Sequence, residues 1–486
     1  MTAAQADVTW ERVADVVVLG YGGAGACAAI AAHDAGVKVL LIEKAPFGGG
    51  NTACALGPMR LPGDVAGAVK YYQALSFGTV ADEDLIWALA EALHDLPGKL
   101  DALGVPLKLV SKGSAMFPTL PGAEALDHWM AGTGNKVFEI LAQNVEKRGI
   151  PVLYGTRARK LVQDPATKAV LGVVIEKDGK EEAIRANRGV ILSTGGYEND
   201  PQLQGYYNFP GVRLYPFGTP YNTGDGVRMA AAVGADPWHF VNVAFMGLSF
   251  KGPADQYGCA FPFQKTRGGF IFVNKTGRRF MNEAKRLTFR KEPLEVTYFD
   301  HEAACYPNLP CYLIFDETQR LKGPLYRMTG GMVGYASIRG FDDWSEDNSA
   351  EIAKGWIIKA NTLEELAART GIDPTGLKQS VGQNNKDHSA QADDAFGRPA
   401  DSRRLIVTPP YYAAEFCLSI VNTQGGPRHN RFAQTLDTEG NIIPRLYTPG
   451  ELGSFFGHLY QGGSNLPEAL AFGRIAGECA AKEKPW

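Results

Sequence analysis

The sequence has 486 residues, of which 45% are hydrophobic and 21% charged, and its formal net charge at pH 7 is −3. This length exceeds what one hydrophobic core usually serves, so two or three domains are expected, and the small net charge gives no indication of a nucleic-acid partner. The 7 cysteines include no CxxC pair, no apolar run is long enough to span a membrane, and the N-terminal residues lack a signal-peptide pattern. We therefore expect a cytoplasmic protein with no metal site and no membrane or nucleic-acid partner.

A βαβ unit is predicted near the N-terminus. Residues 15–19 form a short apolar run that is typical of a buried parallel strand, and the segment GYGGAG follows it. An Ala-rich helix is then predicted up to about Ala35, where Gly36 supplies the glycine that commonly ends helices. Residues 37–42 form the second strand, which Glu43 closes.

Further elements follow from apolar periodicity. Apolar spacings of three and four predict helices over 81–104 and 124–149. Alternation predicts a hairpin formed by 151–162 and 169–177, and residues 189–193 predict another buried strand. The segment Asn361-Thr-Leu-Glu-Glu-Leu has the form of a capped helix start.

The composition changes near residues 245 and 416. The middle of the chain is richer in aromatic residues, proline and mixed charge, whereas the Gly-rich pattern of the first part resumes after it. We predict an α/β fold with a Rossmann-like dinucleotide-binding domain into which an α+β capping, substrate-binding domain is inserted. The predicted boundaries are 1–245 and 416–486 for the two parts of the first domain and 246–415 for the insertion.

The glycines of the GYGGAG segment have the spacing of a dinucleotide fingerprint, Gly20-x-Gly22-x-x-Gly25. The first glycine permits the tight turn, the second allows a pyrophosphate to approach the backbone, and the third allows the helix to pack on the strand. The helix N-terminus would supply N–H groups to the phosphates. Glu43, 18 residues beyond Gly25, is placed to accept hydrogen bonds from ribose hydroxyls. The alternative to a nucleotide-binding site is a Gly-rich turn with a purely structural role. The fingerprint does not distinguish NAD from FAD, because both cofactors share it.

Seven segments identify the cofactor further: GYGGAG, GGNT, STGGY, NTGDG, GRRFMNE, TPGE and YQGGSNL…FGRIAG. In this order they resemble the fumarate reductase/succinate dehydrogenase flavoprotein superfamily, which includes the 3-ketosteroid dehydrogenases. The resemblance covers nearly the whole chain and implies FAD. Covalent members of the superfamily carry a histidine near the GG segment, and GGNTACALG has none, so we expect noncovalent FAD.

The resemblance also assigns roles to individual residues. It implies that Glu43 holds the adenosine ribose, Glu451 the ribitol chain, and residues 51–52 the flavin N5 edge, while residues 464–466 offer N–H groups to the pyrimidine edge and Asp225 braces the FAD side. The complete set of expected FAD-binding residues is Gly20, Gly22, Gly23, Ala24, Gly25, Glu43, Lys44, Gly49, Gly50, Asn51, Thr52, Thr194, Gly195, Gly196, Asp225, Glu451, Ser464, Asn465 and Leu466.

Members of the superfamily oxidise or reduce a C–C bond beside a carbonyl or carboxylate, with hydride passing between a substrate carbon and flavin N5. Glu283 and Arg286 match the Glu-x-x-Arg segment that forms part of the proton path in fumarate reductases. It departs from that pattern at Gly269-Phe270, Asn422 and Tyr460, where the cationic groups that hold a dicarboxylate are replaced. Because a dicarboxylate needs paired cations, fumarate and succinate are not expected substrates.

The segment from Tyr460 to Leu466 looks like the Tyr-and-Gly segment of the 3-ketosteroid dehydrogenases. By resemblance, the Tyr460 hydroxyl and the Gly463 N–H polarise a ketone oxygen, as donors in an oxyanion hole do. The alternative is that Tyr460 packs under the flavin and bonds to the backbone.

The reaction also needs a residue that moves a proton. The Δ1 ketosteroid enzymes use a second tyrosine, and the matching place holds Leu287 or Phe289. Tyr298, His301 and Arg286 are the nearest catalytic candidates. The alternatives are a surface position for His301 and a structural ion pair between Glu283 and Arg286.

The favoured hypothesis is an FAD-dependent dehydrogenase that introduces an α,β C=C bond into a cyclic, largely apolar ketone and passes electrons to an external acceptor. The alternative runs the same chemistry in reverse, as a fumarate-reductase-like reductase of an unsaturated carboxylate. A third hypothesis, a non-catalytic flavin carrier, is disfavoured because a carrier needs no capping domain.

Overall fold

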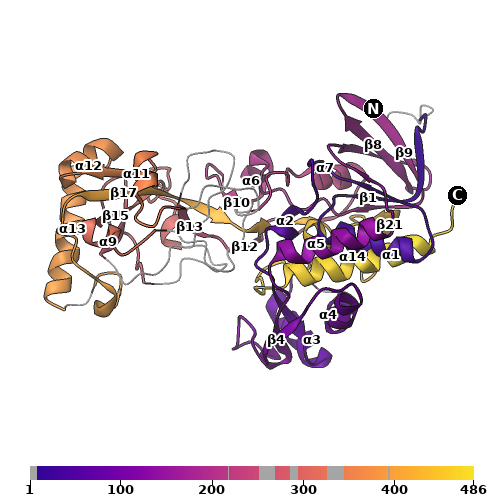
Figure 1. Ribbon diagram of the computed structural model, residues 1–486, viewed down its shortest axis with the longest axis horizontal. Coiled ribbons are helices and arrows are strands. Elements are labelled where there is room, and N and C mark those ends of the chain that lie inside the picture. Colours follow the sequence, from indigo (N-terminus) through magenta and orange to yellow (C-terminus); the bar gives the residue numbers. More distant parts are fainter. Residues whose placement is uncertain are drawn as a thin grey trace.

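The computed structural model describes residues 8–80, 82–208, 210–216, 218–250, 269–284, 294–325, 344–391 and 394–486. Two β-sheets dominate it and lie toward opposite ends of an elongated molecule (Figure 1). The long strand β17 (Tyr411–Ile420) runs from the second sheet toward the first. No helix among the described residues is long and apolar enough to cross a membrane.

The first sheet contains eight strands within the described ranges, ordered β20-β21-β9-β1-β2-β6, with β8 pairing β9 and β7 pairing β8. Strand β1 is parallel to β2 and to β9, and β21, from the C-terminal part of the chain, is parallel to β9. The two ends of the sequence therefore share one sheet, as the predicted Rossmann-like domain requires. The strands are β1 (Arg12–Leu19), β2 (Val39–Ile42), β6 (Val152–Leu153), β7 (Arg157–Gln163), β8 (Val170–Lys177), β9 (Lys180–Leu192), β20 (Gln434–Leu436) and β21 (Ile442–Tyr447).

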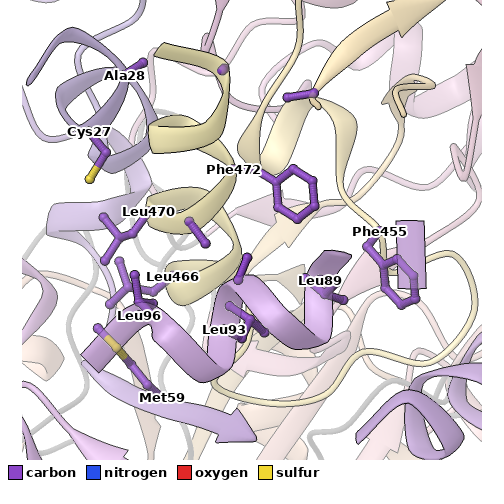
Figure 2. Packing of buried hydrophobic residues seen from close by; sticks show 14 of the residues in the cluster. Cys27, Ala28, Met59, Leu89, Leu93, Leu96, Phe455, Leu466, Leu470 and Phe472 are labelled. Atoms are coloured by element: carbon purple, nitrogen blue, oxygen red, sulfur yellow. The ribbon is translucent and has the colours of Figure 1, made fainter. Parts of the chain in front are cut away.

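Helices α1 (Gly23–Asp34), α5 (Gly134–Lys147) and α14 (Asn465–Lys482) lie side by side along this sheet (Figure 1). Leu466, Leu470 and Phe472 of α14 lie in the buried cluster that α4 (Glu83–Ala102) also enters (Figure 2). Helices α1 and α14 meet at very short range, because a Cβ on Gly477 would stand 2.2 Å from the Ala28 carbonyl oxygen. Only glycine allows this approach between the two ends of the chain.

The second sheet contains six strands within the described ranges, ordered β10-β17-β15-β14, with β13 and β16 also pairing β17. They are β10 (Tyr215–Pro216), β13 (Gly247–Phe250), β14 (Phe270–Asn274), β15 (Cys311–Asp316), β16 (Ile357–Ala360) and β17. Helices α12 (Leu363–Thr370) and α13 (Pro374–Ser389) pack on it through a separate apolar cluster. The α/β fold class with an inserted α+β unit is confirmed. The boundaries at 245 and 416 stay a prediction, since β10 precedes the first and β17 crosses the second.

The remaining elements connect these layers. The helices are α2 (Gly50–Ala53), α3 (Val65–Ser76), α6 (Pro201–Tyr207), α7 (Asp225–Ala232), α8 (Leu294–Thr297), α9 (Glu317–Arg320) and α11 (Ser349–Ala353), with 3-10 turns at Ala123–Ala125, Ala400–Ser402 and Gly450–Gly453. The strands are β3 (Pro58–Pro62), β4 (Lys108–Ser111), β5 (Leu126–Met130), β11 (Pro237–Trp238), β12 (Val243–Ala244), β18 (Asn422–Thr423) and β19 (Gly426–Pro427).

Most local predictions are confirmed and one is wrong. Helix α1 ends before Gly36, whose φ is +85°. Thr362 caps α12 by accepting from the Glu365 N–H, and the Glu365 carboxylate accepts from the Asn361 N–H at 2.9 Å. The helix predicted over 124–149 is wrong in its first part, because β5 pairs with β3 and β4 there and α5 begins only at Gly134.

The contact between α1 and α14 generates a stability prediction. Gly477→Ala should destabilise the protein by about 2 kcal/mol, because overpacking a rigid backbone contact has an effect of that order. Gly98 in α4 is the matched control, since an added Cβ there meets no heavy atom within 4 Å and Gly98→Ala should stabilise by roughly 0.5–1 kcal/mol. Urea unfolding midpoints measure both changes. Equal midpoints for the two variants would contradict the close approach of the helices.

Candidate active site

A cavity of about 480 Å³ is lined by residues from both ends of the sequence. Its walls come from the turn after β1, the segment around α2, the residues after β9, the start of α7 and the first turn of α14. Predicted FAD-binding residues that line it are Gly20, Gly22, Gly23, Ala24, Glu43, Lys44, Gly50, Asn51, Thr52, Thr194, Gly195, Asp225, Glu451, Asn465 and Leu466. Segments that are distant in the sequence therefore form one continuous surface.

The turn between β1 and α1 has the glycine geometry that the fingerprint predicts. Gly20 has φ of +98°, and a Cβ there would stand 2.3 Å from the Ser193 carbonyl oxygen. A Cβ on Gly25 would stand 1.9 Å from the Gly20 carbonyl oxygen. Gly22 differs, because its φ of −92° and ψ of −163° suit any residue and the nearest protein atom to an added Cβ is 3.7 Å away. Neither the backbone conformation nor a neighbouring protein atom requires glycine at position 22. Gly22 lines the cavity, so an added methyl group would occupy cavity space.

An acidic group and a cation lie at one end of the cavity. The Glu43 carboxylate accepts hydrogen bonds from the Tyr21 and Ala45 N–H groups, each at 2.7 Å, and burial raises its pKa. Each oxygen retains a further lone pair for a ligand hydroxyl. Lys44 donates to Asp225 at 2.8 Å. Burial acts to raise the pKa of Asp225, but hydrogen bonds from Arg157 and Lys44 outweigh it and lower that pKa.

A buried polar network forms another wall. The Asn51 amide donates to Glu198 at 2.7 Å and to Glu451 at 2.9 Å, while Asn222 also donates to Glu198, at 2.8 Å. The Gly196 N–H donates to Glu451 at 3.1 Å. Burial and the Glu198 carboxylate raise the pKa of Glu451 well above its usual range, and burial raises the pKa of Glu198 too. Burial and the mutual repulsion of the two carboxylates therefore both favour the protonated form in this pair.

Tyr460 and Gly463 line the cavity together, but their groups contact each other. The Gly463 N–H donates to the Tyr460 hydroxyl oxygen at 3.2 Å, and the Asn465 N–H donates to the same oxygen at 3.3 Å. Burial raises the pKa of Tyr460 to about 12. The oxygen therefore accepts twice and keeps its proton, which leaves the hydroxyl as a donor. In this geometry the Gly463 N–H is bonded to the Tyr460 oxygen.

Several predicted residues lie elsewhere. Glu283 is buried in the second unit, where its carboxylate pairs with Arg279 at 2.6 Å and Arg398 at 3.0 Å. Tyr298 is 57% exposed and His301 is exposed as well. Arg286 lies outside the described residues, as do Leu287 and Phe289. Among the predicted FAD-binding residues, those that do not line the cavity are Gly25, Gly49, Gly196 and Ser464.

The sequence did not identify some of the groups at or behind the cavity wall. Glu198 is buried behind the wall and bonds to the lining residue Asn51, and its only sequence signal was an acidic residue directly after the Gly195-Gly196-Tyr197 segment. Arg60 and Met116 line the end near Tyr460. Neither belongs to a motif, so no pattern in the sequence pointed to them.

Comparison with known proteins identifies the family. The protein-family profile described as FAD binding domain matches residues 15–466. The chain belongs to this family. The probable fumarate reductase Ifc3 of Shewanella frigidimarina is 28% identical over 480 residues, covering 96% of this chain and 74% of that protein. A 3-oxosteroid 1-dehydrogenase of Mycolicibacterium smegmatis is 25% identical over 570 residues, covering 95% of this chain and 96% of that protein.

Solved structures give the same two relationships. The 3-ketosteroid Δ1-dehydrogenase of Sterolibacterium denitrificans, solved with 1,4-androstadiene-3,17-dione, has a TM-score of 0.76 and 25% identity and covers 97% of this chain and 99% of its own. The open conformation of a flavocytochrome c3 fumarate reductase has a TM-score of 0.75 and 26% identity, covering 97% of this chain and 79% of its own. The predicted superfamily is confirmed, and the protein is a flavoprotein oxidoreductase of CH–CH groups with FAD as its cofactor.

The residues at the cavity fit FAD. The space beside Gly22 at the start of α1 suits phosphates, because helix N-termini present free N–H groups there. Glu43 offers acceptors for ribose hydroxyls. Thr194 lines the cavity, and its hydroxyl is buried with no partner among the described residues, so it retains capacity for a hydrogen bond.

Gly22 generates a test of the cofactor site. Gly22→Ala should weaken FAD binding about tenfold or more while leaving the stability of the FAD-free protein nearly unchanged, since the methyl group enters ligand space and contacts no protein atom closely. Gly382→Ala, at a helical position where an added Cβ meets nothing, is the control. Quenching of FAD fluorescence on titration measures the affinity. An unchanged FAD affinity in Gly22→Ala would show that the cofactor does not approach this turn.

Proposed function

We propose that this protein is an FAD-dependent dehydrogenase that introduces an α,β C=C bond into a cyclic ketone. The observation that carries the proposal is the hydroxyl of the cavity-lining residue Tyr460, which accepts two backbone N–H groups while keeping its proton. Its resemblance to the Tyr-and-Gly segment of 3-ketosteroid dehydrogenases supports this assignment.

The geometry supports a defined role for Tyr460. Donation by the Gly463 and Asn465 N–H groups draws electron density from the hydroxyl oxygen and strengthens its O–H as a donor. A ketone oxygen that accepts this proton becomes more polarised, which acidifies the adjacent carbon. The substrate then loses one hydride and one proton as the double bond forms. FAD, when bound, accepts the two electrons that leave the substrate.

The residue that moves the proton is proposed on the sequence motif. Arg286, in the Glu-x-x-Arg segment, stays a candidate for a part in that proton path. The ion pairs of Glu283 with Arg279 and Arg398 support the structural alternative for Glu283. The exposure of Tyr298 and His301 supports surface positions for both. Electrons leave to an external acceptor, and a cytoplasmic location and noncovalent FAD remain parts of this proposal.

A second function is favoured by one specific observation. Arg60 lines the cavity near Tyr460, and a guanidinium there suits a carboxylate substrate. The alternative is reduction of the C=C bond of an unsaturated carboxylate, as in a fumarate-reductase-like enzyme.

Tyr460→Phe tests the proposed reaction. With a cyclic ketone that the wild type oxidises, kcat should fall about tenfold or more while FAD content stays normal, because removing one donor to a developing oxyanion has an effect of at least this order. Tyr72→Phe is the matched control, since its hydroxyl is buried with no partner among the described residues and does not line the cavity. Ketone-dependent reduction of an artificial acceptor measures kcat. Wild-type rates in Tyr460→Phe would remove the assignment.

Noncovalent attachment is tested separately. Acid precipitation of the purified yellow protein should release all of the flavin into the supernatant, because GGNTACALG offers no histidine for a covalent bond. The absorbance of supernatant and pellet measures the partition. Yellow colour that stays with the pellet would contradict the expectation.

A further inference from the structure

Arg60 lines the cavity because successive side chains of β3 point to opposite faces of the strand. Its neighbours Met59 and Leu61 are fully buried, and Met59 points into the apolar cluster beside Leu96 and Leu466 (Figure 2). Successive side chains of a strand point to opposite faces, so Arg60 points away from that cluster and lines the cavity.

Backbone contacts fix Arg60 beside the Tyr460 segment. The Arg60 N–H donates to the Gly463 carbonyl oxygen at 2.9 Å. A Cβ on Gly463 would stand 3.6 Å from Arg60 Cγ. The stem of the arginine therefore passes directly along the loop that positions the Tyr460 hydroxyl.

The guanidinium is only partly satisfied by the protein. Its Nε donates to the Ser114 carbonyl oxygen at 2.6 Å. Its Nη1 is buried and has no partner among the described residues, and no carboxylate of those residues forms an ion pair with it. A charged donor without a partner is unfavourable, so Arg60, which lines the cavity, retains capacity to bind an anion there.

The other titratable groups near Arg60 do not supply an anion. Tyr460 and Tyr71 are its electrostatic neighbours, and burial raises the pKa of both, so they are neutral. His128 lies directly opposite Arg60 across β3 and β5. Burial and the Arg60 charge both lower the pKa of His128, so it too is neutral. The positive charge at this end of the cavity is therefore unopposed by these neighbours.

We propose that Arg60 binds a carboxylate of the substrate. This inference rests on the proposed function and narrows its substrate class to carboxylate-bearing cyclic ketones, whose apolar body lies against Met116 and Phe245 at the same end of the cavity. Arg60 is a specificity residue in this proposal. A single cation suits one carboxylate, which agrees with the loss of the paired cations that a dicarboxylate requires.

The experiment compares cyclic keto acids with their methyl esters, which differ in charge and little in shape. For wild type, kcat/KM should favour the acid. In Arg60→Met, kcat/KM for the acid should fall by about 10- to 100-fold, the effect expected for a lost charge-assisted hydrogen bond, with the ester nearly unaffected. Arg60→Lys should retain part of the preference. Arg12→Met, at an exposed ion pair on β1, is the control and should leave both rates unchanged.

Further readouts separate the possible failures. FAD content and melting temperature of Arg60→Met should match wild type, and loss of FAD, or equal losses of acid and ester turnover, would overturn the proposal because Arg60 would then serve the cofactor or the fold. An equal or better rate of wild type with the ester would overturn it as well. If no ketone turns over, a keto acid that perturbs the flavin absorbance of wild type but not of Arg60→Met would still support the carboxylate site while the proposed reaction fails.

Discussion

The contact between α1 and α14 is the constraint on which the rest of the structure depends. A Cβ on Gly473 or Gly477 would stand 2.3 or 2.2 Å from a carbonyl oxygen of α1. This contact joins the N-terminal βαβ unit to the C-terminal helix, and the pairing of β21 with β9 joins the same parts within the sheet. Because α14 begins at Asn465, within the segment from Tyr460 to Leu466, its position against α1 also sets where that segment lies. The cofactor fingerprint and the proposed catalytic hydroxyl are thus placed relative to each other by the packing of α14 on α1 together with this strand pairing.

The cavity wall also carries an electrostatic constraint. Glu198 and Glu451 are buried beside Gly196, and a Cβ on that glycine would stand within 2.6 Å of an oxygen of each. Burial and the mutual repulsion of the two carboxylates favour a proton on the pair, which then carries one negative charge and not two. A second negative charge there would oppose the electrons that FAD gains in the proposed reaction, so protonation of the pair favours that reaction.

The sequence predicted the features whose causes are local. The glycine turn, the capped start at Thr362 and the end of α1 depend on a few consecutive residues, and each is confirmed. The helix predicted from residue 124 failed because β5 is held by β3 and β4, and a helical apolar spacing in a short segment says nothing about such partners. Glu198 was missed for a related reason, since its partners come from positions 51, 222, 423 and 451.

Tyr460 shows how folding can alter a predicted role without moving the residue. A resemblance places the tyrosine and the following glycine near one ketone oxygen, but it cannot specify where each N–H points. In the structure the Gly463 and Asn465 N–H groups meet at the Tyr460 oxygen. This arrangement leaves one donor hydroxyl, and the Gly463 carbonyl holds the backbone of Arg60 beside the same loop. The same loop therefore holds both the Tyr460 hydroxyl and the backbone of Arg60. Under the proposals above, a substrate must place a ketone oxygen at the first and a carboxylate at the second.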